Sequence, residues 1–261
     1  MAVTAWSITQ SGRYEPFELQ VARGQITWHK TAFQFGINNT VGTSFETIWT
    51  ASSVYSYLSA ASVLKISSGS ADDASAGTGA RTLIISGLDA NYNEISETVI
   101  LNGQTAVNTV NSYLRVFSLK ILTAGSGGSN AGIVYAGTGT VTSGVPATVY
   151  AQIEIGYNDS AMAIWTVPAG YTAYVSSYSF TTNSSTANNQ VTGAVLIRPF
   201  GQVFSFEATA KMAGGNNFDR HFDTYLVLTE KSDIEMQILA SAAAQATGEL
   251  QIMYIKNDAS T

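Results

Sequence analysis

The sequence contains no cysteine, which excludes disulfide scaffolds, thiolate metal sites and thiol catalysis. Charged residues are scarce as well: they make up 11% of the 261 residues, against roughly 25% in an average soluble domain. Solubility must therefore come from Ser, Thr, Asn, Gln and Gly, which suit exposed strand faces and turns better than helices. Few charges also leave strand edges unprotected against self-association, a weakness that a protein built for an assembly tolerates.

Basic runs and long apolar runs are missing too. Lys and Arg are scattered singly, and the formal net charge is −6 with a pI near 4.8. Nothing in such a chain would displace counterions from phosphates, which argues against nucleic acid as a partner. No apolar run approaches the ~20 residues that cross a bilayer. The N-terminus lacks a basic segment followed by an apolar one, so we expect no membrane association and no signal peptide.

What the chain does contain is alternation of apolar and polar residues. The stretches 95–101, 233–238 and 249–254 follow this period of two, which is typical of half-buried strands. Further strands are predicted at 82–86, 113–122, 149–155, 161–167, 171–180, 191–197, 203–207 and 222–228. Strands that recur about every ten residues, with Gly, Asn and Ser between them, predict an all-β fold built from β-sandwich or jelly-roll-like domains.

Helix signals are weak. Residues 53–64 offer a short helix, although Val, Tyr and Ser outnumber good helix formers there. The Ala-rich stretch 240–246 lies between two strong strands, so we expect a loop or a single helical turn.

The chain divides at segments that are rich in Gly and Ser. These segments are 67–79, 124–132 and 137–144. The strand pattern restarts after the third, which predicts a domain boundary near residue 147. The expected parts are a first β domain over 51–147 and a C-terminal β-sandwich domain over 148–261. Residues 1–50 form either an N-terminal arm that docks on a neighbour or extra strands of the first domain.

Groups that perform nucleophilic or acid–base chemistry are few. His29 lies in a predicted strand without an adjacent acid, which favours a structural or surface role. Asp219, Arg220 and His221 form the densest charge cluster. As a metal site this set is incomplete, and Arg220 would repel a cation. An ion-paired turn or an interface contact is the favoured interpretation.

The remaining motifs also favour structural roles. The glycine-rich run 125–132 has no Lys where a phosphate-binding loop requires one. Asp72 and Asp73 match no calcium-loop spacing, so we interpret them as a solvated acidic loop. The sequence thus indicates no catalytic residue, no metal and no cofactor. The two catalytic carboxylates of a glycosidase can lie far apart in sequence, where they form no recognisable motif.

Aromatic residues are plentiful, with 13 Tyr, 11 Phe and 4 Trp. Tyr and Trp are common at protein interfaces and on the rims of sugar-binding sites. Trp6, Trp28 and Trp49 stand among polar stretches of the first 50 residues. Together with Asp219, Arg220 and His221, they are the candidate interface residues.

The segment at 87–103 reads GLDANYNEISETVILNG, and four shorter segments lie at 39–49, 76–82, 122–132 and 165–174. These five segments resemble structural proteins of tailed bacteriophages, especially of phages that infect aquatic bacteria. Together they span roughly residues 39–200. The block at 165–174 is the least specific, because its Val-Pro-Ala-Gly core recurs in many β-sandwich decoration and fibre domains.

The resemblance implies a non-enzymatic component of the phage virion, without catalytic residues to transfer. The leading hypothesis is a capsid decoration or cement protein, which docks on the major capsid protein lattice as a homo-oligomer, with a trimer favoured. It would be assembled in the host cytoplasm and stabilise the head. The alternatives are a tail, baseplate or fibre-attachment component and a receptor- or carbohydrate-binding module. A depolymerase ranks last.

Overall fold

The computed structural model describes residues 6–8, 14–186 and 188–257 of the chain. Their regular structure is almost entirely β, and the paired strands are antiparallel, which confirms the all-β prediction. Within these residues, no helix is long and apolar enough to span a membrane. The elements are β1 (Trp6–Ile8), β2 (Tyr14–Pro16), α1 (Phe17–Ala22), β3 (His29–Val41), β4 (Glu46–Thr47), β5 (Ser62–Ser68), β6 (Ala80–Leu88), β7 (Glu94–Ile100), β8 (Val107–Tyr113), β9 (Arg115–Ala124), β10 (Val134–Thr142), β11 (Val145–Ile153), β12 (Ile164–Thr166), β13 (Tyr171–Asn183), β14 (Gln190–Arg198), β15 (Ser205–Ala213), β16 (Asn217–Leu228), β17 (Asp233–Ala240) and β18 (Ala244–Lys256).

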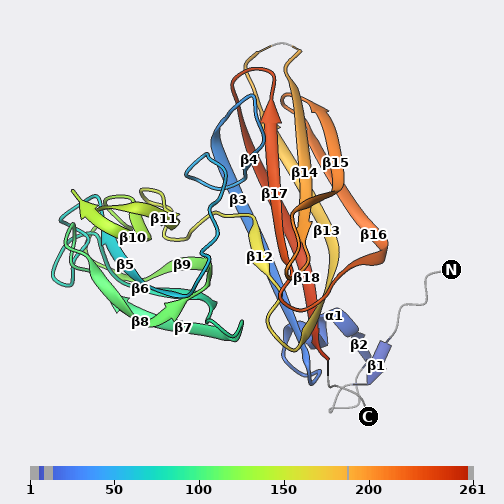
Figure 1. Ribbon diagram of the computed structural model, residues 1–261, viewed down its shortest axis with the longest axis horizontal. Coiled ribbons are helices and arrows are strands. Elements are labelled where there is room, and N and C mark those ends of the chain that lie inside the picture. The colour runs from blue at the N-terminus through green and yellow to red at the C-terminus, as the bar shows by residue number, and fades with distance from the viewer. Residues whose placement is uncertain (1–5, 9–13, 187, 258–261) are drawn as a thin grey trace.

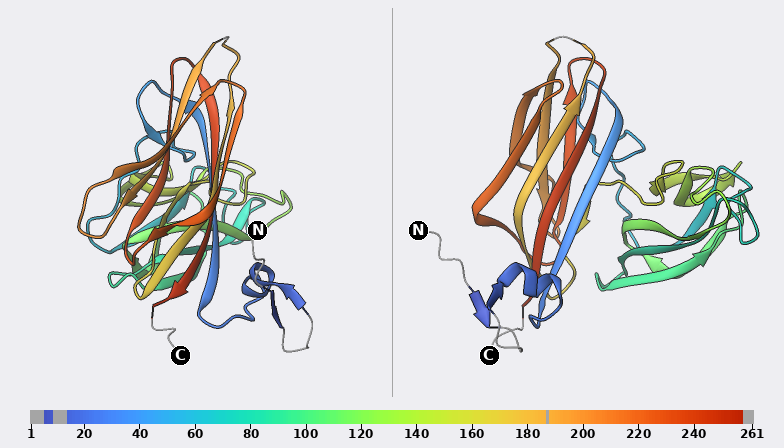
Figure 2. Two further views of the ribbon diagram at one scale, coloured as in Figure 1. Left: turned by 90° about the vertical axis from the view of Figure 1, so that its right-hand side faces the viewer. Right: turned by 180° about the vertical axis from the view of Figure 1, so that it is seen from behind.

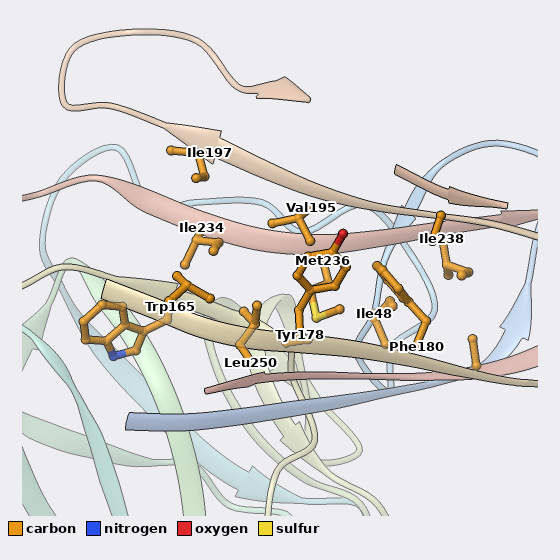
Figure 3. Packing of buried hydrophobic residues seen from close by; sticks show 14 of the residues in the cluster. Ile48, Trp165, Tyr178, Phe180, Val195, Ile197, Ile234, Met236, Ile238 and Leu250 are labelled. Carbon is orange, nitrogen blue, oxygen red and sulfur yellow. The ribbon is translucent and has the colours of Figure 1, made fainter. Parts of the chain in front are cut away.

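Two sheets face each other and form what we term the main sandwich. One sheet has the strand order β16-β13-β18-β3, and the other has the order β12-β17-β14-β15 with β4 paired to β17. Alternate side chains of each strand point inward, and Figure 3 shows them packed between the two sheets. Tyr178, Phe180 and Leu250 come from the first sheet, and Met236 and Ile238 come from the second.

Strands β5 to β11 form a second unit, the inserted sandwich. Its sheets have the orders β11-β10-β5-β8 and β7-β6-β9. Fully buried side chains in its separate core include Leu64, Ile66, Leu83, Ile85, Tyr113, Leu119 and Ile153. In Figure 1 these cyan and green strands stand beside the long blue, yellow and red strands of the main sandwich. Each sandwich thus buries its own apolar layer, as an independent domain does.

The chain passes between the two sandwiches along two connections that meet. Trp49 on the outgoing connection forms an antiparallel bridge with Met162 on the returning one. Beside it, the Ala163 N–H donates a hydrogen bond of 2.9 Å to the Ile48 carbonyl, and the Ile48 N–H donates one of 2.8 Å to the Met236 carbonyl. The right-hand view of Figure 2 shows these connections running between the two sandwiches. The residues between these two connections are therefore an insertion into the main sandwich.

This arrangement differs from the predicted domain boundaries. Residue 147 lies inside a hairpin, because β11 is paired with β10 from its first residue, Val145, onward. The Gly-rich stretch 137–144 is strand and turn rather than linker: Ser143 and Gly144, with φ of 49° and 80°, make the tight turn. Residues 29–41 form β3, which pairs with β18 along the edge of the main sandwich. They are neither an arm nor strands of the first domain.

The helical content also differs from expectation. Residues 53–64 contain no helix: an irregular stretch leads into β5 at Ser62. Its aromatic residues pack locally instead, with the rings of Tyr55 and Tyr57 4.8 Å apart. The unpredicted helix α1 begins directly after Pro16 and ends at Ala22, two residues before Gly24, whose φ of 67° suits a helix end.

Candidate functional site

The three tryptophans proposed as interface residues lie in different surroundings. Trp6 belongs to β1, and its side chain lies outside the described residues. Trp28 is 50% exposed, with the Lys256 ammonium 4.7 Å from its ring centre. Trp49 is buried, and its indole N–H donates a hydrogen bond of 2.8 Å to the Ser53 carbonyl. It stabilises the crossing between the sandwiches and is not accessible to a partner.

Asp219, Arg220 and His221 lie within the edge strand β16 and not in a turn. Strand alternation places Asp219 and His221 on the outer face of the sheet and Arg220 on the opposite face. There the Arg220 guanidinium lies 5.6 Å from the centre of the Phe222 ring. Among the described residues no ion pair joins the three. The ion-paired turn is wrong, and the interface role stays a prediction.

Asp73 was expected in a solvated loop, but its side chain is fully buried. Its carboxylate accepts hydrogen bonds from the N–H groups of Ala80, Ala131 and Gly132 and from the Ser68 hydroxyl, over 2.6–2.9 Å. These partners belong to or flank two Gly/Ser-rich segments of the inserted sandwich. The acid thus organises the loops of this domain, because each bond satisfies a donor that would otherwise be buried unpaired.

A buried cluster of charges joins the two sandwiches. Asp233, at the start of β17, is 2% exposed. It accepts bonds of 2.8 Å from Arg115 Nε and 2.6 Å from Arg198 Nη2, and a third of 2.6 Å from the Thr166 hydroxyl. Arg115 begins β9 of the inserted sandwich, whereas Arg198 ends β14 of the main sandwich. One carboxylate therefore holds guanidinium groups from both sandwiches.

Strand register explains how the cluster forms. Asp233 is the cross-strand partner of Arg198 on one side and of Thr166 on the other, so three adjacent strands present polar groups at one level. Arg115 reaches this level from the other sandwich, and its Nη1 also donates to the carbonyls of Leu58 and Leu114. The pairing offsets the cost of burying these charges.

A cavity of about 610 Å³ lies beside this cluster, between the sandwiches. The guanidinium of Arg198 lies 4.5 Å from the centre of the Tyr57 ring. The ammonium of Lys231 lies 5.9 Å from the centre of the Tyr92 ring and 5.3 Å from that of Phe200. All five residues line the cavity together with Arg115 and Asp233. The cavity wall is thus built of aromatic rings and cations, many of which touch each other.

A second acid, Glu235, lies near this cluster. Its carboxylate accepts a hydrogen bond of 3.0 Å from the Tyr57 hydroxyl and another from the Gln237 amide. Burial raises the pKa of the Glu235 carboxyl to about 7, although both hydrogen bonds and the charge of Arg198 favour the ionised form. Tyr57 precedes the first strand of the inserted sandwich, so this contact also connects the two units.

The raised pKa of Glu235 predicts a pH dependence of stability. Because the folded protein takes up this proton below about pH 7 and the unfolded chain only near its ordinary value of 4.5, stability contributed by the proton is lost as pH rises from about 4.5 to 7. Glu235→Gln is expected to flatten this slope and to raise the free energy of unfolding by about 3 kcal/mol above pH 7.

Urea unfolding at acidic and mildly alkaline pH measures this effect. The matched control is Glu207→Gln on β15, where the carboxyl is exposed. The expectation fails if Glu235→Gln and the control retain the same pH slope as the unmodified protein.

A further set of contacts joins the start of β7 in the inserted sandwich to the main sandwich. Glu94, at the start of β7, accepts a hydrogen bond of 2.7 Å from the Tyr254 hydroxyl and pairs with the Lys30 ammonium. Next to it, the Ala169 N–H donates a backbone bond of 2.9 Å to the Tyr92 carbonyl. The sandwiches therefore touch at two sets of polar contacts besides the chain crossing, which restrains their relative orientation.

The outward side of the sheet β16-β13-β18-β3, which we term the outer face, is polar around Asp219 and His221 but carries exposed apolar side chains elsewhere. Phe33 on β3 is 55% exposed, and Tyr225 and Val227 on β16 are about as exposed. Phe33 stacks on Phe35, and Tyr225 packs edge-on against Tyr174 of β13. A hollow of about 260 Å³ crosses this face between the rings of Phe33 and Tyr225. Exposed apolar patches of this kind mark surfaces that contact other molecules.

In the parts of the chain that the structure describes, no group of three or more His, Asp or Glu side chains is placed to hold a metal ion. The contact region of the two sandwiches around Asp233, which we term the junction, contains charged and aromatic side chains. The outer face contains exposed apolar side chains.

The sequence matches no model of a known protein family and no curated protein sequence. Among solved structures, it is similar to a structure of the infectious bursal disease virus Gx strain, with 10% identity, a TM-score of 0.29, and coverage of 89% of this chain and 73% of that one. The VP2 subviral particle of the same virus gives 12% identity, a TM-score of 0.24, and coverage of 90% and 74%. With TM-scores below 0.5, these similarities carry no inference about this chain.

Proposed function

We propose that this chain is a non-enzymatic structural protein of a bacteriophage virion, and that it decorates the capsid by docking on the major capsid protein lattice. The observation that carries this proposal is the group of exposed apolar side chains around Phe33 and Tyr225 on the outer face of a protein with few charged residues. Exposed apolar side chains promote nonspecific association of a free monomer, whereas in a subunit of an assembly they become buried at an interface. The resemblance of residues 39–200 to phage structural proteins supports the same role.

Mass action provides the mechanism. A copy docked through its outer face buries apolar surface that the assembled lattice presents and the dissociated subunits do not. Binding to the assembled form alone stabilises it, so the particle resists heat. A homo-oligomer, with a trimer favoured, would multiply this effect by engaging several capsid subunits at once.

The copy number on purified particles tests the proposed location. Quantitative mass spectrometry that finds the chain in proportion to the major capsid protein supports capsid decoration. A copy number in proportion to tail proteins favours the alternative, a tail or baseplate component. Absence from washed particles would reject a virion role altogether.

Substitution of the outer face tests the docking surface. The double variant Phe33→Thr, Tyr225→Thr keeps residues that suit strands but removes both exposed rings. We expect its affinity for particles that lack the protein to fall roughly tenfold or more, because central aromatic residues dominate interface energies. Co-sedimentation with such particles measures this loss.

Val110→Thr provides the matched control. Val110 is 89% exposed, but it lies on β8 of the inserted sandwich. This variant should bind as the unmodified protein does. Equal binding by the double variant and the control, with both folded, would contradict docking through the outer face.

A further inference from the structure

The cavity between the sandwiches has the size and position of a ligand site. Its volume of about 610 Å³ is in the range of pockets that enclose small molecules. It lies where two domains meet, which is a frequent location for such pockets. Both sandwiches contribute to the wall: Tyr92 and Arg115 come from the inserted sandwich, and Arg198 and Lys231 come from the main sandwich.

The charge of this wall is opposite to that of the whole protein. The chain has a net charge of −6 and only 12 Lys and Arg residues, yet Arg115, Arg198 and Lys231 all line this cavity. Asp233 is the one carboxylate among the lining residues. Glu235 is not part of the lining, and its raised pKa reduces its charge near neutral pH. A partly enclosed wall with surplus positive charge attracts anions more strongly than an open surface does, because water screens it less.

Two of the three cationic side chains have N–H groups that make no hydrogen bond with the described residues. Arg115 uses Nε and Nη2 on Asp233, and it uses Nη1 on two carbonyl groups. Arg198 uses only Nε and Nη2, both on Asp233, and its side chain is 26% exposed. The Lys231 ammonium has no hydrogen bond or ion pair with the described residues, and it lies near the rings of Tyr92 and Phe200. Arg198 Nη1 and the Lys231 ammonium therefore supply unused N–H groups beside one cavity.

The Arg198 guanidinium and the Lys231 backbone are both held by contacts within the protein. Asp233 fixes the guanidinium of Arg198, and the Tyr57 and Phe204 rings lie on it at 4.5 Å each. Lys231 has a left-handed backbone, with φ of 62°, and its N–H donates to the Val167 carbonyl at 2.9 Å. Because these contacts restrain the Arg198 guanidinium, a ligand loses less of its binding energy to ordering that side chain.

We propose that this cavity is a binding site for an oxyanion, which Lys231 and Arg198 contact directly while Asp233, itself held by Arg115, positions Arg198. The carboxylate of an acidic peptide segment and free phosphate share the required chemistry: negative oxygens that accept N–H donors from ammonium and guanidinium groups. This site is separate from the outer face, and it does not depend on a role in the virion.

Calorimetric titration of the full chain with inorganic phosphate and with the tripeptide Glu-Glu-Glu, at low ionic strength, tests the site. Lys231→Asn removes the charge and retains a residue that tolerates the left-handed backbone. We expect it to weaken binding roughly tenfold, the effect of losing one charge-assisted contact. Lys231→Gly serves as a second variant if the first fails to fold.

Lys256→Asn is the matched control, because this lysine also lies over an aromatic ring, that of Trp28, away from the cavity. It should bind as the unmodified protein does. Tighter binding of the tripeptide would identify an acidic protein segment as the source of the oxyanion, and tighter binding of phosphate would identify a free ion. Binding of neither probe, or equal weakening by the Lys231 and Lys256 variants, would overturn the proposal.

Discussion

Asp233→Ala is expected to lower the free energy of unfolding by roughly 3–5 kcal/mol, the usual cost of removing one partner from a buried ion pair. The side chain of Arg115 is only 8% exposed, and it would lose its counterion without gaining water. Arg198 would lose both of its hydrogen bonds to the carboxylate. Urea unfolding followed by circular dichroism measures the change.

The same substitution should loosen the junction. Arg115 is the one residue of the inserted sandwich that Asp233 holds, so its release removes a restraint between the two units. Small-angle X-ray scattering should then show a larger radius of gyration for the folded variant. Asp223→Ala on β16, where the acid is exposed, is the control and should change neither quantity. A loss below about 1 kcal/mol for Asp233→Ala would mean that the pair only balances its desolvation cost.

Gly36→Ala is the second substitution with a large expected effect. A Cβ atom at this position would lie 2.0 Å from the Ile48 carbonyl oxygen and 2.5 Å from the Ala163 nitrogen. Both atoms belong to the hydrogen-bonded crossing of the two connections, so neither can move alone. We expect a loss of about 3 kcal/mol or more in the free energy of unfolding, since overpacking here must shift backbone.

Gly69→Ala offers a control with the same chemical change. The nearest heavy atoms to a Cβ at Gly69 are 3.9 Å away, an ordinary contact distance. Its cost should stay within about 1 kcal/mol, the range of a simple change in backbone freedom. Thermal and urea unfolding of both variants measure the two losses in the free energy of unfolding. Equal stabilities would show that the crossing adapts to the added methyl group.

The strands could be predicted from the sequence because each carries its own local pattern. The period of two in 233–238 and 249–254 placed β17 and β18, whose inward residues, such as Met236 and Leu250, are buried. The connectivity could not be predicted in this way. Pairing of β3 with β18 joins segments about as far apart as the chain allows, and no local signal records it. A glycine-rich turn also resembles a linker in sequence, which misplaced the boundary near residue 147.

The charged cluster at the junction could not be predicted from the sequence, for a related reason. Asp233 and Glu235 alternate with apolar residues, which predicts a polar face open to water. In the structure that face is covered by the inserted sandwich, so both acids are 2% exposed. Arg115 is 118 positions away from Asp233, beyond any motif spacing. The one usable signal was two acids at alternate positions of a strongly apolar strand in a chain with few charges.

The insertion also sets an order of events during synthesis. Strands β5 to β11 are contiguous, so the inserted sandwich contains all the pairing partners of its sheets once β11 has left the ribosome. The main sandwich lacks that advantage, because β3 pairs only with β18, which follows all the other described strands. Until β18 is made, β3 presents a long unpaired edge with Phe33 and Phe35 on it. The nascent chain therefore carries a finished domain beside an open strand that another chain can capture.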